Sequence, residues 1–180
     1  MDDGAQAHAA LTFEAQVARM MLSFPDDASI QFLNAGAGNA LMEALAASTT
    51  GYAASHMLKG LTALAHDSGN AAQLLAAGVA EAIMAAVDKH CTRGRMLSAD
   101  SKCTWVLSAA MLAIAALAAS APADSARLST TGACEVVVTA VRLHTDVQES
   151  DETCWYWEYS RLEALAALAA AAGAANTSSE

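Results

Sequence analysis

The stretch NAAQLLAAGVAEAIMAAVDKH, residues 70–90, decides the fold of this chain. It has a short apolar segment, an Ala-Gly pair and a second apolar segment that ends in charged residues. The same plan recurs in ASIQFLNAGAGNALMEALAAS at 28–48 and in DSARLSTTGACEVVVTAVRLH at 124–144. The glycines that occupy the same place in the three copies are Gly36, Gly78 and Gly132. Because glycine adopts the left-handed conformation that ends a helix at little cost, the repeat predicts a stack of helices.

The composition agrees with an all-α fold. The chain has 180 residues, of which 55% are hydrophobic, enough to bury one continuous core. Alanine is the commonest residue, and Pro25 and Pro122 are the only prolines. Alanine costs least in a helix and allows helices to approach closely. We therefore predict a single all-α domain, residues 6–173.

Each unit is predicted to contain three helices. The predicted units are 28–65, 70–119 and 124–170, after a disordered start at 1–5 and a leading helix at 6–22, with a frayed tail at 174–180. In the first unit, the helices are expected at 28–34, 38–47 and 52–65, with Asp26 and Asp27 capping the first of them. Gly36 and Gly78 are 42 positions apart, whereas Gly78 and Gly132 are 54 apart. A loop at 91–101 accounts for the surplus, because surface loops tolerate insertion.

The valine run of the third unit is ambiguous by itself, because β-branched residues also favour strands. The register of the repeat favours a helix. The three columns that it predicts are Leu41, Ile83 and Val137, then Met42, Met84 and Val138, then Leu45, Val87 and Val141. A last helix is predicted at 154–170, in register with the one at 105–119.

Three helices per unit, the Leu-Leu-Ala-Ala-Gly-Val hinge and a period near 42 resemble the armadillo repeat, with the HEAT repeat as its neighbour. This resemblance implies a short right-handed α-solenoid of about three units, whose third helices line a groove that binds peptides or proteins. Importin-alpha-like members carry a tryptophan and asparagine ladder in a segment like WALSNLA. The tryptophan place here holds Lys59, Leu112 and Glu163. The asparagine place holds Ala63, Ala116 and Ala167, so binding of nuclear signals is not expected.

Aromatic residues mark the candidate binding site. Tyr52, Trp105 and Tyr156 form one column near the start of the third helices, which packing between units also explains. The segment CWYWEY, 154–159, carries more aromatic rings than one helix can turn to a core, so some should be exposed as an interaction site. The predicted protein-binding residues are Trp155, Tyr156, Trp157, Tyr159, Lys59 and Arg161.

The charge of the chain bears on its partners. A net charge of −10 argues against nucleic acid, which needs basic patches. The basic cluster Lys89, His90, Arg93 and Arg95 is interpreted as a solvated loop.

The cysteines and the N-terminus bear on the compartment. The four cysteines lack CxxC spacing and the N-terminus lacks a basic signal region, which favours a reduced intracellular compartment, cytoplasmic or nuclear.

No chemistry of catalysis or cofactor binding is predicted. The histidines and cysteines lack the spacing of a zinc site, apart from the adjacent His90 and Cys91. The chain has no nucleophile elbow, no phosphate-binding glycine loop and no HExxH. Glu81 and Glu135 occupy equivalent positions, which indicates a solvated face. We therefore predict a non-catalytic protein without metal or cofactor.

The predicted function is a protein-interaction module or scaffold. An alternative is a membrane-associated helical protein, because residues 103–123 carry no charge and have the length of a span. Buried packing in the stack explains the same apolarity. A small all-α enzyme is a further alternative. The apolar final helix is a poor cap for a repeat stack, which predicts a longer array, a partner on the end face or self-association.

Overall fold

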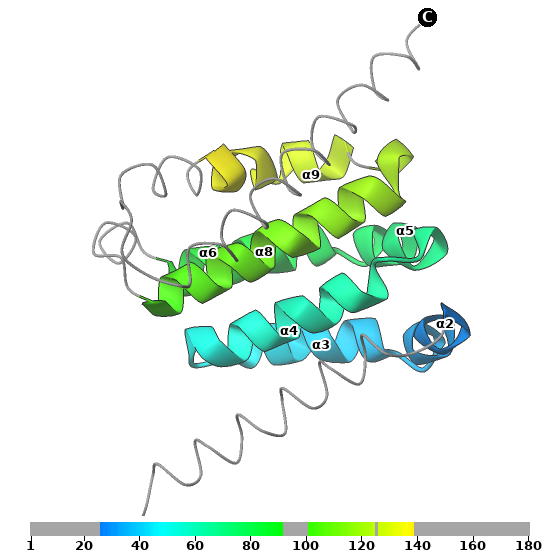
Figure 1. Ribbon diagram of the computed structural model, residues 1–180, viewed down its shortest axis with the longest axis horizontal. Coiled ribbons are helices and arrows are strands. Elements are labelled where there is room, and N and C mark those ends of the chain that lie inside the picture. Colours follow the sequence, from blue (N-terminus) through cyan, green and yellow to red (C-terminus); the bar gives the residue numbers. More distant parts are fainter. Residues whose placement is uncertain (1–25, 92–100, 125, 139–180) are drawn as a thin grey trace, which may run out of the picture.

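The computed structural model describes residues 26–91, 101–124 and 126–138, which form helices joined by short turns (Figure 1). Within these ranges no residue is in a strand. The elements are α2 (Asp26–Asn34), α3 (Ala37–Ala47), α4 (Gly51–Leu64), α5 (Ser68–Ala76), α6 (Val79–His90), α8 (Ser101–Ser120), the 3-10 helix η1 (Pro122–Asp124) and α9 (Ala126–Thr130). Residues 133–138 are again helical. The all-α prediction is confirmed for this part of the chain.

Local sequence explains where the helices begin. Thr50 precedes α4, and its side chain accepts a hydrogen bond from the backbone N–H of Ala53 at 3.2 Å. Asp67 precedes α5 and accepts from the backbone N–H of Asn70 at 2.9 Å. Both side chains satisfy donors that the first helical turn leaves without a partner. These capped starts separate α4 from α3 and α5 from α4.

The three repeat glycines all have left-handed backbones. The φ angles of Gly36, Gly78 and Gly132 are 89°, 93° and 90°. Gly36 lies between α2 and α3, and Gly78 lies between α5 and α6. A residue with a Cβ is strained in this conformation, which explains why glycine recurs at the place where one helix ends and the next begins. The predicted hinge is confirmed at all three positions.

Several helices begin earlier than the sequence predicted, among them α2 and α8. The helix α2 begins at Asp26, so Asp26 and Asp27 belong to its first turn instead of preceding it. The prediction that these aspartates cap a helix from residue 28 is therefore wrong. A carboxylate in the first turn still interacts favourably with the positive end of the helix dipole. The helix α8 begins at Ser101, four positions before the predicted start at Trp105.

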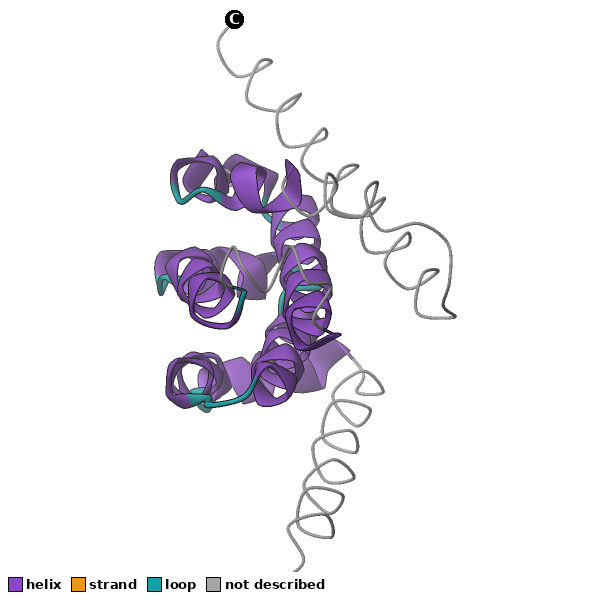
Figure 2. Cartoon of the chain, turned by 90° about the vertical axis from the view of Figure 1, so that its left-hand side faces the viewer, coloured by secondary structure: helices purple, strands orange, loops and turns teal. Residues whose placement is uncertain are grey.

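Helices at equivalent places in successive units lie against one another. The first helices α2 and α5 are in contact, as are the second helices α3 and α6 and the third helices α4 and α8. Figure 2 shows the resulting tiers of helices, and in Figure 1 α4 and α8 lie in front of α3 and α6. The third helices therefore form one layer, and the second helices form another behind it.

The core runs through these tiers without a break. Its largest fully buried side chains are Leu45, Leu58, Leu61, Leu64, Leu74, Leu75, Val79, Ile83, Met111, Ile114, Leu117 and Leu128. From Val106 to Ala118, every residue of α8 except Leu112 is buried. The apolar segment 103–123 thus coincides largely with a helix, α8, that is buried on nearly all sides from Val106 to Ala118.

The predicted columns follow the burial. Ile83 and Val137 of the first column and Leu45 and Val87 of the third are each 1% exposed. Val136, Val137 and Val138 are helical, so the preference for a helix over a strand is confirmed there. Val138 is 46% exposed. The leading helix at 6–22, the loop residues 92–100, Val141 and the helix at 154–170 lie outside the described residues.

Among the described helices, no single one is both long and apolar enough to cross a bilayer. The consecutive helices α5 and α6 meet that test together by length and composition, but they are bent by 69° at the turn between them.

Candidate interaction surface

One surface collects the residues that the sequence singled out on the third helices. On α4, Tyr52, His56 and Lys59 are spaced by four and three positions, so they share one side of the helix. On α8, Trp105 and Leu112 occupy the places equivalent to Tyr52 and Lys59. None of these five residues is buried. We call this set the α4–α8 face.

Aromatic contacts join the two helices at one end of this face. The rings of Tyr52 and Trp105 meet edge to face, with centroids 5.5 Å apart and planes at 71°. The ring of His56 lies 4.5 Å from that of Tyr52. Edge-to-face pairs at such distances are favourable beyond the area that they bury. The predicted aromatic column is confirmed for Tyr52 and Trp105, whereas Tyr156 lies outside the described residues.

The aromatic pair is not sealed within the core. Trp105 remains 42% exposed although its ring packs on Tyr52. Packing between units is therefore confirmed for this pair, and the exposed part of the Trp105 ring leaves the binding interpretation a prediction. An exposed tryptophan on a rigid helix supplies a large contact area at little entropic cost.

Lys59 supplies the charge of the α4–α8 face. Its side chain is half-buried, and burial lowers the pKa of its ammonium group from the ordinary value of 10.5. The cause is desolvation, since a less polar surrounding disfavours the charged form. An acidic group brought close to Lys59 would favour the charged form again. Lys59 is the one predicted binding residue that lies in the described part of the chain.

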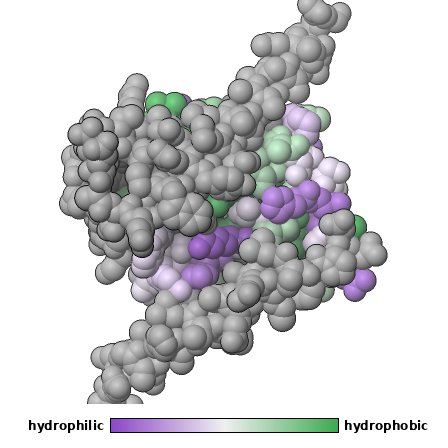
Figure 3. Space-filling model, viewed as in Figure 1, coloured by the Kyte–Doolittle hydropathy of each residue, from purple (hydrophilic) through white to green (hydrophobic). Residues whose placement is uncertain are grey.

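Small side chains occupy the places that the asparagine of an importin-alpha-like ladder would take. Ala63 is half-buried and Ala116 is 7% exposed. Alanine has no group that could bond a peptide backbone, so recognition on this surface would depend on the aromatic rings, Leu112 and Lys59. Figure 3 shows hydrophobic (green) and hydrophilic (purple) residues next to one another on this side of the molecule.

Acidic residues are segregated from the α4–α8 face. Neither α4 nor α8 contains an aspartate or a glutamate. The acidic residues of the described ranges are Asp26, Asp27, Glu43, Asp67, Glu81, Asp88, Asp124 and Glu135. Of the five residues that define the α4–α8 face, Lys59 carries a positive charge and none carries a negative one.

A second polar cluster joins α3 to α6. The Oγ of Ser48 lies 3.1 Å from Nε2 of His90, and the same hydroxyl donates to the carbonyl of Leu45 at 2.7 Å. Because that bond uses the hydroxyl proton, Ser48 accepts from the Nε2–H of His90. Beside it, Lys89 Nζ donates to the carbonyl of Ala46 at 2.8 Å.

This cluster corrects the interpretation of the basic residues near 90. His90 is 5% exposed, so it is not part of a solvated loop. It ends α6 and bonds the preceding unit, and Lys89 does the same with its side chain. Arg93 and Arg95 lie outside the described residues. The sequence did contain a signal, since Ser48 and His90 are 42 positions apart, the same as Gly36 and Gly78.

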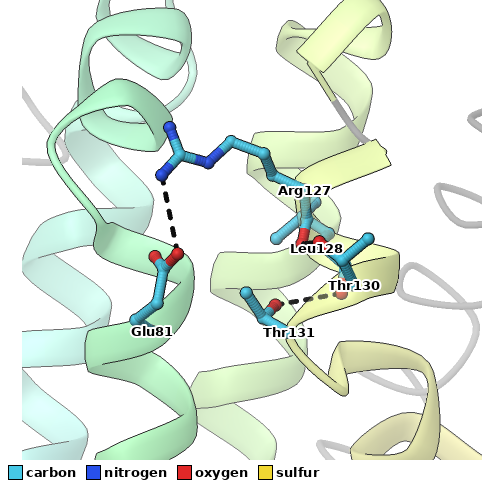
Figure 4. Close-up of polar contacts among 5 residues, drawn as sticks. All are labelled: Glu81, Arg127, Leu128, Thr130 and Thr131. Carbon is cyan, nitrogen blue, oxygen red and sulfur yellow. Dashed lines mark hydrogen bonds and ion pairs between the residues drawn. The ribbon is translucent and has the colours of Figure 1, made fainter.

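An ion pair joins the second unit to the third. Arg127 of α9 lies 3.5 Å from the carboxylate of Glu81 on α6, and both side chains are about half exposed (Figure 4). In α9, the hydroxyl of Thr130 donates to the carbonyl of Arg127, and that of Thr131 donates to the carbonyl of Leu128. Glu81 and Glu135 are exposed, as the predicted solvated face requires.

The cysteines are thiols in the part of the chain that the structure describes. Cys91 and Cys103 are buried, and Cys134 is partly buried. Cys91 Sγ lies 3.4 Å from the carbonyl oxygen of Cys103, across the junction between α6 and α8. Over the described ranges, no three His, Cys, Asp or Glu side chains gather in a way that could hold a metal ion.

The other predicted binding residues cannot be placed on this surface. Trp155, Tyr156, Trp157, Tyr159 and Arg161 lie outside the described residues. The candidate surface therefore consists of Lys59 from the predicted set and of Tyr52, His56, Trp105 and Leu112 around it.

Comparison of the chain with models of protein families, with curated proteins and with solved structures finds no match.

Proposed function

We propose that this chain is a short right-handed α-solenoid of armadillo-like units that acts as a protein-interaction module or scaffold, without catalytic activity, metal or cofactor. Support comes from the repeated contact between equivalent helices and from the left-handed glycine at the same place in each unit. A helical stack of this kind presents long, continuous surfaces to other proteins. We further propose an intracellular site of action, where thiols such as Cys91 stay reduced.

One observation carries the functional part of this proposal. Trp105 is 42% exposed on a core helix that is buried from Val106 to Ala118 apart from Leu112, and its ring packs on that of Tyr52. Tryptophan anchors that are rigid before binding are typical of interaction hot spots. The α4–α8 face thus combines an exposed apolar ring with a fixed orientation.

Affinity purification with chemical crosslinking tests the proposal. The full chain would be compared with Trp105→Ala and with Glu81→Gln, a matched control on α6. We expect Trp105→Ala to lose partners that the parent chain and Glu81→Gln both retain, with crosslinks from the lost partners mapping to α4 and α8. A double variant, Trp155→Ala with Trp157→Ala, tests the second predicted aromatic site in the same way.

The outcomes separate the alternatives. Partners that survive both aromatic variants would discard the aromatic surfaces as the binding site. If the parent chain gives no reproducible crosslinked partner, the scaffold function is wrong. Circular dichroism and a thermal melt of each variant show whether a loss of partners reflects the surface or the fold.

A further inference from the structure

The first unit exposes residues whose equivalents in the second unit are buried. Equivalent places in these two units are 42 positions apart. Phe32 of α2 is 39% exposed, whereas Leu74, its equivalent on α5, is 1% exposed. Two pairs on the second helices differ in the same sense, with the more exposed residue of the first unit named first: Leu41 and Ile83, and Ala44 and Ala86. The difference therefore extends over both α2 and α3.

In the second unit, these places are covered by the first unit. The helices α2 and α5 are in contact, as are α3 and α6. The packing is close, because a Cβ added to Gly38 of α3 would lie 2.8 Å from Cδ2 of Leu74. The side of α2 and α3 that carries Phe32, Leu41 and Ala44 is therefore the side on which another unit would pack. We call it the first-unit face.

The opposite end of the described stack carries the matching half of this contact. In Figure 1, α2 and α3 lie at one end of the stack and α9 lies at the other. Met84 of α6 faces the third unit, since its Cε would lie 3.5 Å from a Cβ added to Gly132. Val138 occupies the equivalent place in the third unit and is 46% exposed. We call the side of residues 133–138 that carries Val138 the third-unit face.

We propose that the first-unit face of one copy of this chain binds the third-unit face of a second copy, so that copies associate head to tail. One chain carries both halves of the contact that joins its own successive units, which favours a second copy over an unrelated partner. Such a contact joins two different surfaces, so it can be repeated from copy to copy. This association uses the ends of the stack and is separate from partner binding on the α4–α8 face.

A polar position at the same contact makes the inference more specific. Within the chain, Arg127 of the third unit lies 3.5 Å from Glu81 of the second. Between copies, the equivalent places hold Gln31 of the first unit and Glu135 of the third, and both residues are exposed. An arginine in place of Gln31 would complete an ion pair of the same kind. The contact between copies should therefore respond to one added charge at this place.

The net charge of −10 opposes the association of two copies. Charges on exposed side chains are largely screened beyond about 8 Å at physiological ionic strength and beyond about 3 Å at 1 M salt. The burial of apolar surface is not weakened by this screening. We therefore expect the association to strengthen as salt is added.

Sedimentation velocity of the full chain, from micromolar to millimolar concentration, tests the inference. We expect the sedimentation coefficient to rise with concentration. Ala44→Glu should weaken the association at least about tenfold, because it buries a carboxylate without a partner in the contact. Ala85→Glu is the matched control, since it adds the same charge at an exposed place of α6 whose equivalent on α3 is Glu43. Circular dichroism of both variants checks that they fold.

A second set of variants tests for a gain of association. Gln31→Arg should strengthen it about twofold, the size expected of an exposed ion pair. Glu135→Gln in the same background should cancel this gain. Gln73→Arg adds the same charge on α5, away from the first-unit face, and so separates the ion pair from the change in net charge.

Contrary outcomes are distinguishable. A chain that stays monomeric at millimolar concentration in high salt would overturn the inference. Association that is as strong in Ala44→Glu as in Ala85→Glu would also overturn it. A lower melting temperature of Ala44→Glu alone would then show that a segment of the same chain covers the first-unit face. Association that is lost only with Trp105→Ala would place the contact on the α4–α8 face instead.

Discussion

Two contacts between units are built differently, although both join equivalent helices. The contact between α4 and α8 draws on apolar side chains, among them Leu58, Leu61 and Ile114, each at most 1% exposed. The contact between α3 and α6 ends in polar bonds, from His90 to Ser48 and from Lys89 to a backbone carbonyl. Apolar contact contributes most to stability but has little directional preference, whereas hydrogen bonds require one alignment. We infer that the first contact stabilises the stack and the second sets its register.

The largest expected effect tests the apolar contact. Ile114→Ala removes a fully buried side chain from α8 and leaves a cavity, so it should lower the free energy of unfolding by about 2–5 kcal/mol. Urea denaturation followed by circular dichroism measures this change. Leu112→Ala on the same helix is the control, because Leu112 is only half-buried and should cost clearly less. Equal losses would show that α8 is not held chiefly by its buried side.

The next effect tests the polar contact. Ser48→Ala leaves the Nε2–H of His90 buried without its acceptor, which should cost about 1–3 kcal/mol. A double-mutant cycle with His90→Leu should show a coupling energy of at least about 0.5 kcal/mol. Additive losses from Ser48→Ala and His90→Leu would mean that the bond does not connect the units energetically.

The sequence predicted the apolar contact between α4 and α8 better than the polar contact between α3 and α6, and the reason is physical. Helix positions follow from short-range patterns, such as Thr50 before α4 and the glycine with a positive φ at 78. The pairing of Tyr52 with Trp105 follows from their equivalent places at the start of third helices. These features can be predicted from the repeat alone, without knowing how deeply a side chain is buried.

The burial of His90 requires more than the repeat. The polar and basic residues next to His90 in the sequence are typical of a solvated segment. In the structure, however, the last turn of α6 lies against α3, and the imidazole is buried. Only the register between helices, which tertiary packing decides, separates a buried terminal residue from an exposed one. Of the predicted binding residues, Lys59 alone lies in the described chain, and its partners on the surface come from α8 as well as from α4.

A smaller effect concerns the turns within each unit, which both contacts need. Gly78→Ala places a Cβ at a φ of 93° and should cost about 1–2 kcal/mol in a thermal or urea melt. Gly36→Ala should cost a similar amount, because its φ is 89° and no atom lies within 4 Å of the added carbon. Gly78→Asn is the control, since asparagine tolerates this conformation better than alanine. If Gly36→Ala leaves the free energy of unfolding unchanged, the left-handed backbone does not strain a residue with a Cβ at this position.

Lys59 offers a pH-dependent test of the one described charge on the α4–α8 face. Its pKa is lower in the folded than in the unfolded chain, so the buried charge destabilises the fold below the folded-state pKa. That cost shrinks as the pH rises from the lowered value towards 10.5. Lys59→Met should therefore be more stable at pH 7, by less than about 1 kcal/mol because the side chain is partly screened by water.

The measurement for Lys59 is the difference in stability between the parent chain and Lys59→Met as a function of pH. We expect the difference to narrow between pH 7 and pH 10.5. Lys89→Met, at an exposed lysine, is the matched control. If the stability advantage of Lys59→Met over the parent chain instead grows as the pH rises, Lys59 stabilises the fold as a cation.

The smallest effect sharpens the comparison at the next contact along the stack. Arg127 and Glu81 are both about half exposed, and their ion pair at 3.5 Å should contribute about 0.3 kcal/mol, less in high salt. The equivalent places in the preceding units hold Gln73 and Asn39, which are uncharged. Replacing the pair by Arg127→Gln and Glu81→Asn should therefore change the melting temperature by little. A loss above about 1 kcal/mol, or one that persists in 1 M salt, would show that this contact sets register as the bond between His90 and Ser48 does.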